Sequence, residues 1–557
     1  MKKISIDVEQ RMIEDLIPEL ESGKFYLPSF QRRWIWDEDD IKTLFDSIIN
    51  SLPIGVIILW KPSIVSPDKT DPFSIPLINV ERKESNEMFY VIDGQQRLTS
   101  LLLLFNNWKF QRAKEFIECK IPIAYNPSNN KIYKSKTRGF DLFELTKAYW
   151  QNDIAILNKL EKEAPRKHQV DMKDKIYRIL KYKIPIYKMA TNEENEETFA
   201  DMAEAFIRVN KYGVRIGNLE LMLSFLAGSI SGDIKKNIYD LYEPCEKEFG
   251  IDLHPIIRFA FSNFALRQTQ ISKVKQFKSN IEIIKKVQKE EKDCIFARSK
   301  TAINLSIQFI KNRTGINNSG LLPSQIPILI IASYFYHSKI ENIDQLNQET
   351  SKKIINWFVL VNFNGFYSSS TDTKIDEDLG VINSNEEFPF ELLIENMKKK
   401  KAKIKITNSD IRRGLKSNVL RREGRAYLFF LYLLLVKQKS DNWNGRLLSQ
   451  SPLNEIARHH IYPKDFLENK LDIEDPDEKE IEINNLGNIT FIHKDINSEI
   501  GEEPPESYMN KYIESAKKHF ISSDEALWKY SKYREHLEYR VNEICRVGKV
   551  LFKEIYE

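Results

Sequence analysis

Short hydrophobic runs alternate with helical patterns in the first part of the chain, from residue 1 to about residue 231. Runs rich in β-branched and aromatic residues, bounded by Pro, Gly or Asn, predict strands at Val56–Trp60, Phe89–Ile92 and Ile121–Tyr125. Acidic residues at the start of Asp37–Ile49 complement the positive end of a helix dipole, so this stretch predicts a helix. The mixture predicts an α/β domain.

Helical periodicity replaces this mixture after residue 231. Ile303, Ile307 and Ile310 recur at i, i+4 and i+7, which predicts one buried helical face in a mostly helical middle region. Further on, the apolar stretch Arg425–Lys437 predicts a long helix. We therefore expect an α+β multidomain protein with three regions, residues 1–231, 232–396 and 397–557.

Size and composition are those of an ordinary globular protein with several cores. The chain has 557 residues, 42% hydrophobic and 29% charged, with a formal net charge of only +4. Its longest apolar runs, Ile326–Phe335 and Ala426–Val436, fall well short of the about 20 residues that a membrane helix needs. Four scattered cysteines without CxxC spacing favour a reducing cytosol over a structural zinc site. We expect a cytoplasmic protein with no membrane partner.

The stretch FYVIDGQQRLTSLLLLF, Phe89–Phe105, joins an apolar strand to an apolar helix through an Asp93-Gly94 turn. A helix that opens at Gln95 directs its first amide groups above this turn, where they can bind phosphate, and Gly94 permits close approach of a ligand. Arg97 could hold phosphate oxygens with paired hydrogen bonds, while Asp93 could hold a metal ion or orient water. The same residues also fit an Asp-Gly turn followed by a solvated helical turn.

Two further polar clusters lie within apolar sequence of the same region. LPSFQRRWIW contains Gln31, Arg32 and Arg33, and AFIRVNKYG contains Phe206 and Asn210. Three such clusters in one mixed domain indicate a pocket that handles phosphate.

In this order, LPSFQRRWIW, VIDGQQRLTSL and FIRVNKYG resemble the ParB-like domain of GmrSD-type proteins, which are bacterial restriction enzymes directed at modified DNA. The resemblance implies that this domain binds and hydrolyses a nucleoside triphosphate, with GTP, CTP and ATP all open. It implies nucleotide-binding roles for Gln31, Arg32, Asp93, Gly94, Gln95, Gln96, Arg97 and Asn210. Asp93 and Arg97 are also the implied catalytic residues of hydrolysis.

The segment Arg458–Tyr508 places two adjacent histidines before an Ile-x-Pro strand break, RHHIYP, and two spaced asparagines after it. His460 is the candidate general base, since a neutral imidazole near pH 7 can take a proton from water. His459 and Asn497 are candidate ligands of Mg²⁺ or Mn²⁺, which would neutralise charge on a scissile phosphate. Asn488, in the GN turn, is expected to support catalysis as a structural residue.

The ordered set HHIxP, GNIT and IN resembles the HNH-like nuclease domain, a ββα-metal fold, that is joined to the ParB-like domain in GmrSD and SspE proteins. Many HNH enzymes carry an acid where His459 stands, and here the last ligand is Asn497 instead of a histidine. His493 is a competing ligand. By itself, the histidine pair would also fit an exposed loop followed by an asparagine-rich turn.

A basic stretch precedes this segment, with twelve Lys or Arg between Lys398 and Arg425 against Asp410 and Glu423. Such residues can meet the phosphate backbone without reading sequence, although a run of lysines also fits a solvated face. The candidate DNA-binding residues are Lys399, Lys401, Arg412, Arg413 and Arg421.

Together these features predict an NTP-regulated, divalent-metal-dependent endonuclease that restricts modified phage DNA. DNA and a nucleoside triphosphate are the expected partners, and a homodimer would suit double-strand cutting. One alternative is an NTP-hydrolysing sensor of DNA modification that acts by binding, with a degenerate nuclease domain. Another is an RNA-directed nuclease toxin.

Overall fold

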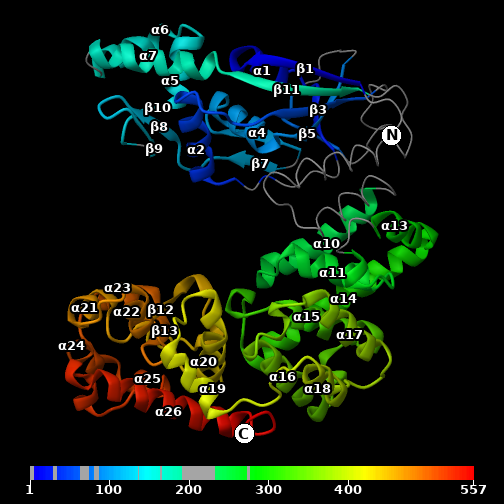
Figure 1. Cartoon of the computed structure of the whole chain (residues 1–557), viewed down its shortest axis with the longest axis vertical. Coiled ribbons are helices and arrows are strands. Elements are labelled where there is room, and N and C mark those ends of the chain that lie inside the picture. Colours follow the sequence, from blue (N-terminus) through cyan, green and yellow to red (C-terminus); the bar gives the residue numbers. More distant parts are fainter. Residues whose placement is uncertain are drawn as a thin grey trace. The chain divides into compact units, whose positions relative to one another are not determined.

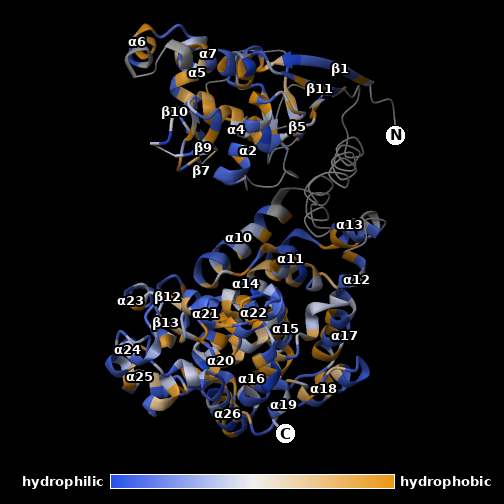
Figure 2. Ribbon diagram, turned by 60° about the vertical axis from the view of Figure 1, so that its left-hand side comes forward, coloured by the Kyte–Doolittle hydropathy of each residue, from blue (hydrophilic) through white to orange (hydrophobic). Residues whose placement is uncertain are grey.

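The computed structural model describes residues 5–28, 34, 36–62, 74–80, 87–113, 115–135, 137–163, 166–190, 232–271 and 276–557 (Figure 1). The chain divides into two compact units, Met1–Lys236 and Asn237–Glu557. Figure 2 shows hydrophilic residues over much of the outer ribbon and hydrophobic residues along the strands and helices inside each unit. Each unit therefore has its own hydrophobic core.

A six-stranded mixed sheet forms the centre of the first unit, in the order β1-β11-β3-β5-β2-β4. Its central strand pair, β3 and β5, is antiparallel, and β2 runs parallel to β5 on the other side. The strands expected near residues 56 and 89 are both present. The sheet strands are β1 (Ser5–Met12), β2 (Phe25–Leu27), β3 (Ile57–Lys61), β4 (Ile75–Pro76), β5 (Phe89–Asp93) and β11 (Lys183–Ala190).

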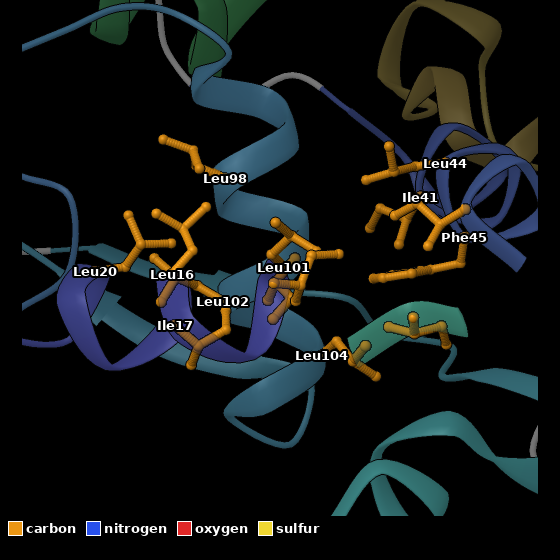
Figure 3. Close-up of a cluster of buried hydrophobic side chains, with 14 of the residues drawn as sticks. Leu16, Ile17, Leu20, Ile41, Leu44, Phe45, Leu98, Leu101, Leu102 and Leu104 are labelled. Atoms are coloured by element: carbon orange, nitrogen blue, oxygen red, sulfur yellow. The ribbon is translucent and has the colours of Figure 1, made fainter. Parts of the chain in front are cut away.

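Helices pack on this sheet because each carries one apolar face. Leucines of α4 (Gln95–Phe105) lie between apolar side chains of α1 (Ile13–Leu20) and α2 (Glu38–Ile49) (Figure 3). The Asp37 side chain accepts hydrogen bonds from the backbone at the start of α2, which explains why the helix begins there. The other helices are α5 (Leu142–Trp150), α6 (Ile154–Glu163) and α7 (Arg166–Leu180).

Two small antiparallel sheets complete the described part of this unit. One pairs β6 (Lys109–Arg112) with β7 (Glu115–Glu118). The other has the order β10-β8-β9, formed by β8 (Ile123–Asn126), β9 (Lys131–Lys134) and β10 (Phe140–Asp141). The strand expected at Ile121–Tyr125 is therefore β8, shifted by two residues.

The second unit is mostly helical and includes both the middle region and the third region expected from the sequence. Its helices are α10 (Gly232–Phe249), α11 (Leu253–Ser262), α12 (Gln268–Ile271), α13 (Phe277–Lys286), α14 (Lys289–Thr314), α15 (Ile326–His337), α16 (Gln348–Phe363), α17 (Thr371–Asn383), α18 (Phe390–Lys399), α19 (Asn408–Arg412), α20 (Arg425–Lys437), α21 (Lys464–Lys470), α22 (Pro476–Ile483), α23 (Lys494–Ile500), α24 (Pro505–Tyr508), α25 (Ile513–Lys518) and α26 (Tyr533–Leu551).

The two longest apolar runs form α15 and α20, which are buried over most of their surface, as the sequence predicts. Within the described ranges, none of the helices combines the length and the apolarity that crossing a bilayer would require. Ile303, Ile307 and Ile310 share the buried face of α14.

One antiparallel strand pair interrupts the helices of the second unit. It consists of β12 (Ile456–His460) and β13 (Ile489–His493), and α23 follows directly (Figure 1). The first strand ends at His460, three residues earlier than the Pro463 position expected from the sequence, and the second begins at Ile489. This strand pair and α23 carry the histidines and asparagines of interest.

Candidate functional site

The strand-turn-helix of the first unit is built as the sequence predicts. β5 ends at Asp93, Gly94 adopts a left-handed conformation with φ of 94°, and α4 begins at Gln95. A Cβ atom at Gly94 would lie 2.3 Å from Cδ1 of Ile57 on the neighbouring strand. Backbone conformation and space therefore both require glycine at this turn.

Arg97 is held in a defined position by two acceptors. Its Nη2 donates to Oδ2 of Asp93 at 2.8 Å, and its Nη1 donates to the backbone oxygen of Ile54 at 2.9 Å. Gly55 has φ of 86°, and a Cβ there would lie 2.5 Å from Nη1 of Arg97. The Ile54-Gly55 loop thus belongs to this site and was not predicted. Its Pro-Ile-Gly sequence, which follows a helix, is the one signal of an unusual turn that the local sequence offers.

The two glutamines at the start of α4 are buried, with 4% of Gln95 and 6% of Gln96 exposed. The alternative of a solvated first helical turn is therefore wrong. Oε1 of Gln96 accepts a hydrogen bond from the Trp36 backbone at 3.4 Å, whereas Oε1 of Gln95 has no partner among the described residues. The other implied nucleotide-binding residues, Gln31, Arg32 and Asn210, lie outside the described residues, as do Arg33 and Phe206.

In the second unit, His459 is buried and lies between two side chains. Its Nδ1 is 2.9 Å from Oδ1 of Asn497, and its Nε2 is 3.1 Å from Oη of Tyr508. The Tyr508 hydroxyl donates its hydrogen to the backbone oxygen of Ile461 at 2.6 Å, so toward His459 it can only accept. The proton of a neutral His459 is therefore on Nε2.

This tautomer makes two acceptors face each other. Burial lowers the pKa of His459 to about 3, so the ring is neutral near pH 7. The lone pair of Nδ1 then points at the lone pairs of Oδ1 of Asn497 across 2.9 Å. Two acceptors at that separation repel each other unless a cation contacts both or the amide turns to present its NH₂ group.

His460 lies at the end of β12, partly buried, with a different partner. Its Nε2 is 2.7 Å from Oδ1 of Asn484, the residue that ends α22. Because an amide oxygen accepts, Nε2 carries the proton and Nδ1 keeps a lone pair. Burial lowers the pKa of His460 below its ordinary range. Asn484 was not predicted, although it is the first residue of the NNLGN sequence.

Asn488 is fully buried and bonds only to backbone groups. It accepts from the Tyr462 amide at 2.8 Å and donates to the oxygens of Tyr462 and Ile483 at 3.0 and 2.9 Å. These bonds join the chain after β12 to the end of α22 and the start of β13. Asn488 is thus a supporting residue that fixes the geometry around His460 and Asn484.

Arg540 of α26 contacts the backbone of the NNLGN loop (residues 484–488) and was not predicted. Its buried guanidinium donates to the backbone oxygens of Leu486, Gly487 and Ile489 at 2.9, 3.1 and 2.7 Å. Burial lowers the pKa of Arg540 to about 9. Nothing in the local sequence links α26 with the NNLGN loop, since the two are far apart along the chain.

The competing ligand His493 lies at the other end of the strand pair, opposite Ile456 in the register. Its Nδ1 accepts from the Asp495 amide at 3.3 Å and so caps α23. Across the described part of the chain, no group of three or more His, Cys, Asp or Glu side chains is arranged to hold a metal ion. His459 and Asn497 therefore form the pair of candidate ligands that the structure brings together.

Most of the five predicted DNA-binding residues contact acidic side chains. Four of them are ion-paired within the second unit: Lys399 with Glu395 at 3.3 Å, Arg412 with Glu538, Arg413 with Asp410 at 3.2 Å, and Arg421 with Asp477 at 3.3 Å and with Glu480. Lys401 is exposed in a tight turn after α18. Exposed ion pairs are weak enough to be exchanged for phosphate, but these charges already have partners.

An arginine outside that stretch has a different environment. Arg458 lies on β12, two residues before His460, and no salt bridge involving it occurs among the described residues. Partial burial and the positive charge of nearby Arg425 lower the pKa of Arg458. Arg458 was not predicted, because a single basic residue separated from the lysine-rich run forms no pattern in the sequence.

Comparisons with known proteins give one family match within each of the two units. Residues 13–227 match the family described as GmrSD restriction endonuclease, N-terminal domain, and residues 405–547 match GmrSD restriction endonucleases, C-terminal domain. The uncharacterized protein MJ0686 of Methanocaldococcus jannaschii is 22% identical, over 92% of this chain and 88% of that protein. The first matched range contains β5 and α4, and the second contains β12, β13 and α23.

Proposed function

Because the chain belongs to the GmrSD restriction endonuclease family, we propose that it is a divalent-metal-dependent DNA endonuclease that is regulated by a nucleoside triphosphate and directed at modified DNA. The family implies the endonuclease activity. The observation that carries the metal dependence is the approach of Nδ1 of His459 to Oδ1 of Asn497 at 2.9 Å.

The residues present fit a divalent cation. Nδ1 of His459 and Oδ1 of Asn497, which lie 2.9 Å apart, would hold the cation, since an imidazole nitrogen and an amide oxygen are both suitable ligands for it. Tyr508 holds the other ring nitrogen, which is the usual way in which a ligating histidine is fixed in one tautomer. Water and phosphate oxygens would supply the other ligands of the ion. Such an ion, when bound, neutralises charge on the scissile phosphate.

The chain's own residues supply the base. Nδ1 of His460 takes a proton from the water that attacks phosphorus, while Oδ1 of Asn484 accepts a hydrogen bond from Nε2–H and stabilises the imidazolium that forms. As the phosphorus-oxygen bond to the leaving deoxyribose breaks, its oxygen takes a proton from solvent. The lowered pKa of His460 keeps the ring unprotonated and ready at neutral pH.

The strand-turn-helix of the first unit is the proposed nucleotide site. The amide groups at the start of α4 and the guanidinium of Arg97 can meet phosphate oxygens, while Gly55 makes room for that guanidinium and Gly94 permits the tight turn before the helix. The buried Oε1 of Gln95 can accept from a ligand hydroxyl or amine, which would relieve the free-energy cost of its missing donor. Asp93 would orient the attacking water once Arg97 turns to the phosphates.

A second candidate function follows from the same pair of side chains. If the Asn497 amide is turned, its NH₂ group donates to His459 and no cation is needed. The protein would then be an NTP-hydrolysing sensor of DNA modification whose nuclease domain is degenerate. Titration with Mn²⁺ separates the two functions, because the degenerate site would neither bind the ion nor cut.

The direct test is cleavage of phage DNA by the full chain, with modified and unmodified templates, with and without each of GTP, CTP and ATP, in Mg²⁺ or Mn²⁺. We expect cutting of one modified class, dependent on both metal and nucleotide, and none by His460→Ala. An RNA substrate in the same series tests the toxin alternative. Undiminished cutting by His460→Ala would overturn the proposed mechanism.

A further inference from the structure

Arg458 and His460 share one face of β12. Side chains alternate along a strand, so residues two apart point to the same side, about 6.7 Å from each other along the chain. Arg458 is paired with Phe491 on β13, and the Phe491 ring contacts Tyr432 of α20 edge-on at 5.1 Å. This face of the strand pair is therefore turned toward α20, whereas His459 lies on the opposite face.

The first residue of α20, the helix that packs against this face through Tyr432, provides a second guanidinium, that of Arg425. Arg425 donates to the backbone oxygen of Gly320 at 3.3 Å and lines a polar hollow of about 380 Å³. The walls of this hollow include Asn318 and Ser319 and also one acid, Asp252. The hollow leaves room for a ligand beside the guanidinium of Arg425.

In the part of the chain that the structure describes, neither guanidinium forms a salt bridge with a carboxylate. Asp252, the acid that lines the hollow, is not paired with either of them. This contrasts with Arg412, Arg413 and Arg421, whose carboxylate partners are given above. Both arginines stay charged at neutral pH, so a bound anion would supply the negative partner that the described carboxylates do not provide. Planar guanidiniums bind phosphate oxygens with paired hydrogen bonds, which suits them to a phosphodiester.

We propose that Arg458 and Arg425 bind the sugar-phosphate backbone of the DNA substrate next to the phosphate that is cut at His460. The backbone would run from His460 past Arg458 to Arg425 and the hollow beside α15. The inference rests on the proposed function as a DNA endonuclease and gives the helical middle region a part in holding the substrate. Since the contacts are to phosphate, they position DNA without reading its sequence.

The test is DNA binding by the full-length His460→Ala protein, which holds substrate without cutting it, measured by fluorescence anisotropy over a range of salt concentrations. Adding Arg458→Gln or Arg425→Gln should weaken binding by roughly ten- to hundredfold and reduce the slope of log affinity against log salt by about 0.9 per lost contact. Arg446→Gln is the matched control, since Arg446 is paired with Glu455 at 3.4 Å and should leave both quantities unchanged.

Arg458→Lys keeps the charge and should recover most of the salt slope but not all of the affinity. Thermal unfolding of each variant shows whether it is folded, and the two glutamine variants test the site independently of each other. Unchanged affinity and slope in both, in a parent that binds DNA, would overturn this inference alone. A parent that binds no DNA, with a wild-type chain that cuts none, would overturn the proposed function as well.

Discussion

The two candidate sites differ in how their parts are brought together. Around β12, β13 and α23, the side chains of the proposed nuclease site contact neighbours within the second unit. His459 lies against Asn497 and Tyr508, and His460 lies against Asn484. In the strand-turn-helix of the first unit, the described contacts are fewer. Asp93 and Arg97 are paired with each other, and the buried Oε1 of Gln95 has no donor among the described residues.

The site around β12, β13 and α23 is therefore preorganised, whereas the charged groups of the strand-turn-helix are paired with each other. Neutral, buried histidines held by neighbours can act on a substrate without rearrangement. By contrast, Arg97 must leave Asp93 before its Nη2 can contact a phosphate, so binding of a nucleotide would change the local ion pairing. We therefore expect the two sites to respond differently to substitution.

The largest expected effect is that of His460→Ala on DNA cutting. Loss of the general base should lower the cleavage rate by about 10²–10⁴-fold and leave NTP hydrolysis unaffected, because the base belongs to the second unit alone. His493→Asn is the matched control, since an asparagine oxygen can still cap α23. A His493→Asn variant as inactive as His460→Ala would show that the wrong histidine has been assigned.

Arg97→Ala should produce the reverse pattern, with NTP hydrolysis reduced by about 10²–10³-fold and nucleotide binding weakened.

Gly55→Ala should reduce hydrolysis more mildly, because its Cβ would displace Nη1 of Arg97 from the Ile54 oxygen. Gly445→Ala controls for backbone strain: Gly445 has φ of 77°, and no described atom lies within 4 Å of a Cβ placed there. Equal hydrolysis in the Gly55→Ala and Gly445→Ala proteins would argue against the Arg97 contact.

Tyr508→Phe tests the tautomer of His459. Without the hydroxyl that accepts from Nε2, the ring can turn or carry its proton on Nδ1, and Mn²⁺ affinity should fall by about 10–100-fold. Calorimetric titration measures the affinity. Tyr512→Phe removes a hydroxyl from the ring stacked on Trp443 in the same cluster and should change little. The tautomer argument fails if both variants bind Mn²⁺ like the wild type.

The smallest effect is a dependence of stability on pH. Burial lowers the pKa of His459, His519 and His536 to about 3, 4 and 3, so the folded state stays neutral while the unfolded state takes up protons below about pH 6.5. Each contributes stability that is present above pH 6.5 and is lost as pH falls, by about 1.4 kcal/mol per pH unit.

One buried acid opposes this trend. Burial raises the pKa of Asp378 to about 6, so its protonated folded form offsets about one histidine between pH 6 and pH 4. The urea midpoint of the full chain should still fall between pH 7 and pH 5, and His536→Leu should flatten the fall. A midpoint that rises over this interval would contradict the neutral, buried histidines.

Much of the fold could be predicted from local sequence. Arg425–Lys437 is a helix with the bounds expected from its apolar run, and Asp93-Gly94 forms the expected turn, because both features depend on neighbouring residues alone. The approach of His459 to Asn497 could also be anticipated from the order of motifs within one short segment.

Contacts between distant segments could not be predicted. The carboxylates that pair with Arg412 and Arg421 come from α26 and α22. The basic run therefore looked free to bind DNA, whereas half of its charges are paired with described carboxylates. Arg540, which supports the NNLGN loop, approaches it through packing of α26. The buried position of Gln95 likewise depends on tertiary packing that an Asp-Gly turn does not specify.

The central claim, a cation held by His459 and Asn497 beside the base, is tested most directly by DNA cleavage as a function of Mn²⁺ concentration in the wild-type chain and in Asn497→Ala. The account predicts no cutting in EDTA, saturable activation of the wild type, and a half-activating concentration at least about tenfold higher in Asn497→Ala. Asn469→Ala, on the exposed side of α21, should match the wild type. Cutting that persists in EDTA, or the same Mn²⁺ response in Asn497→Ala, would contradict it.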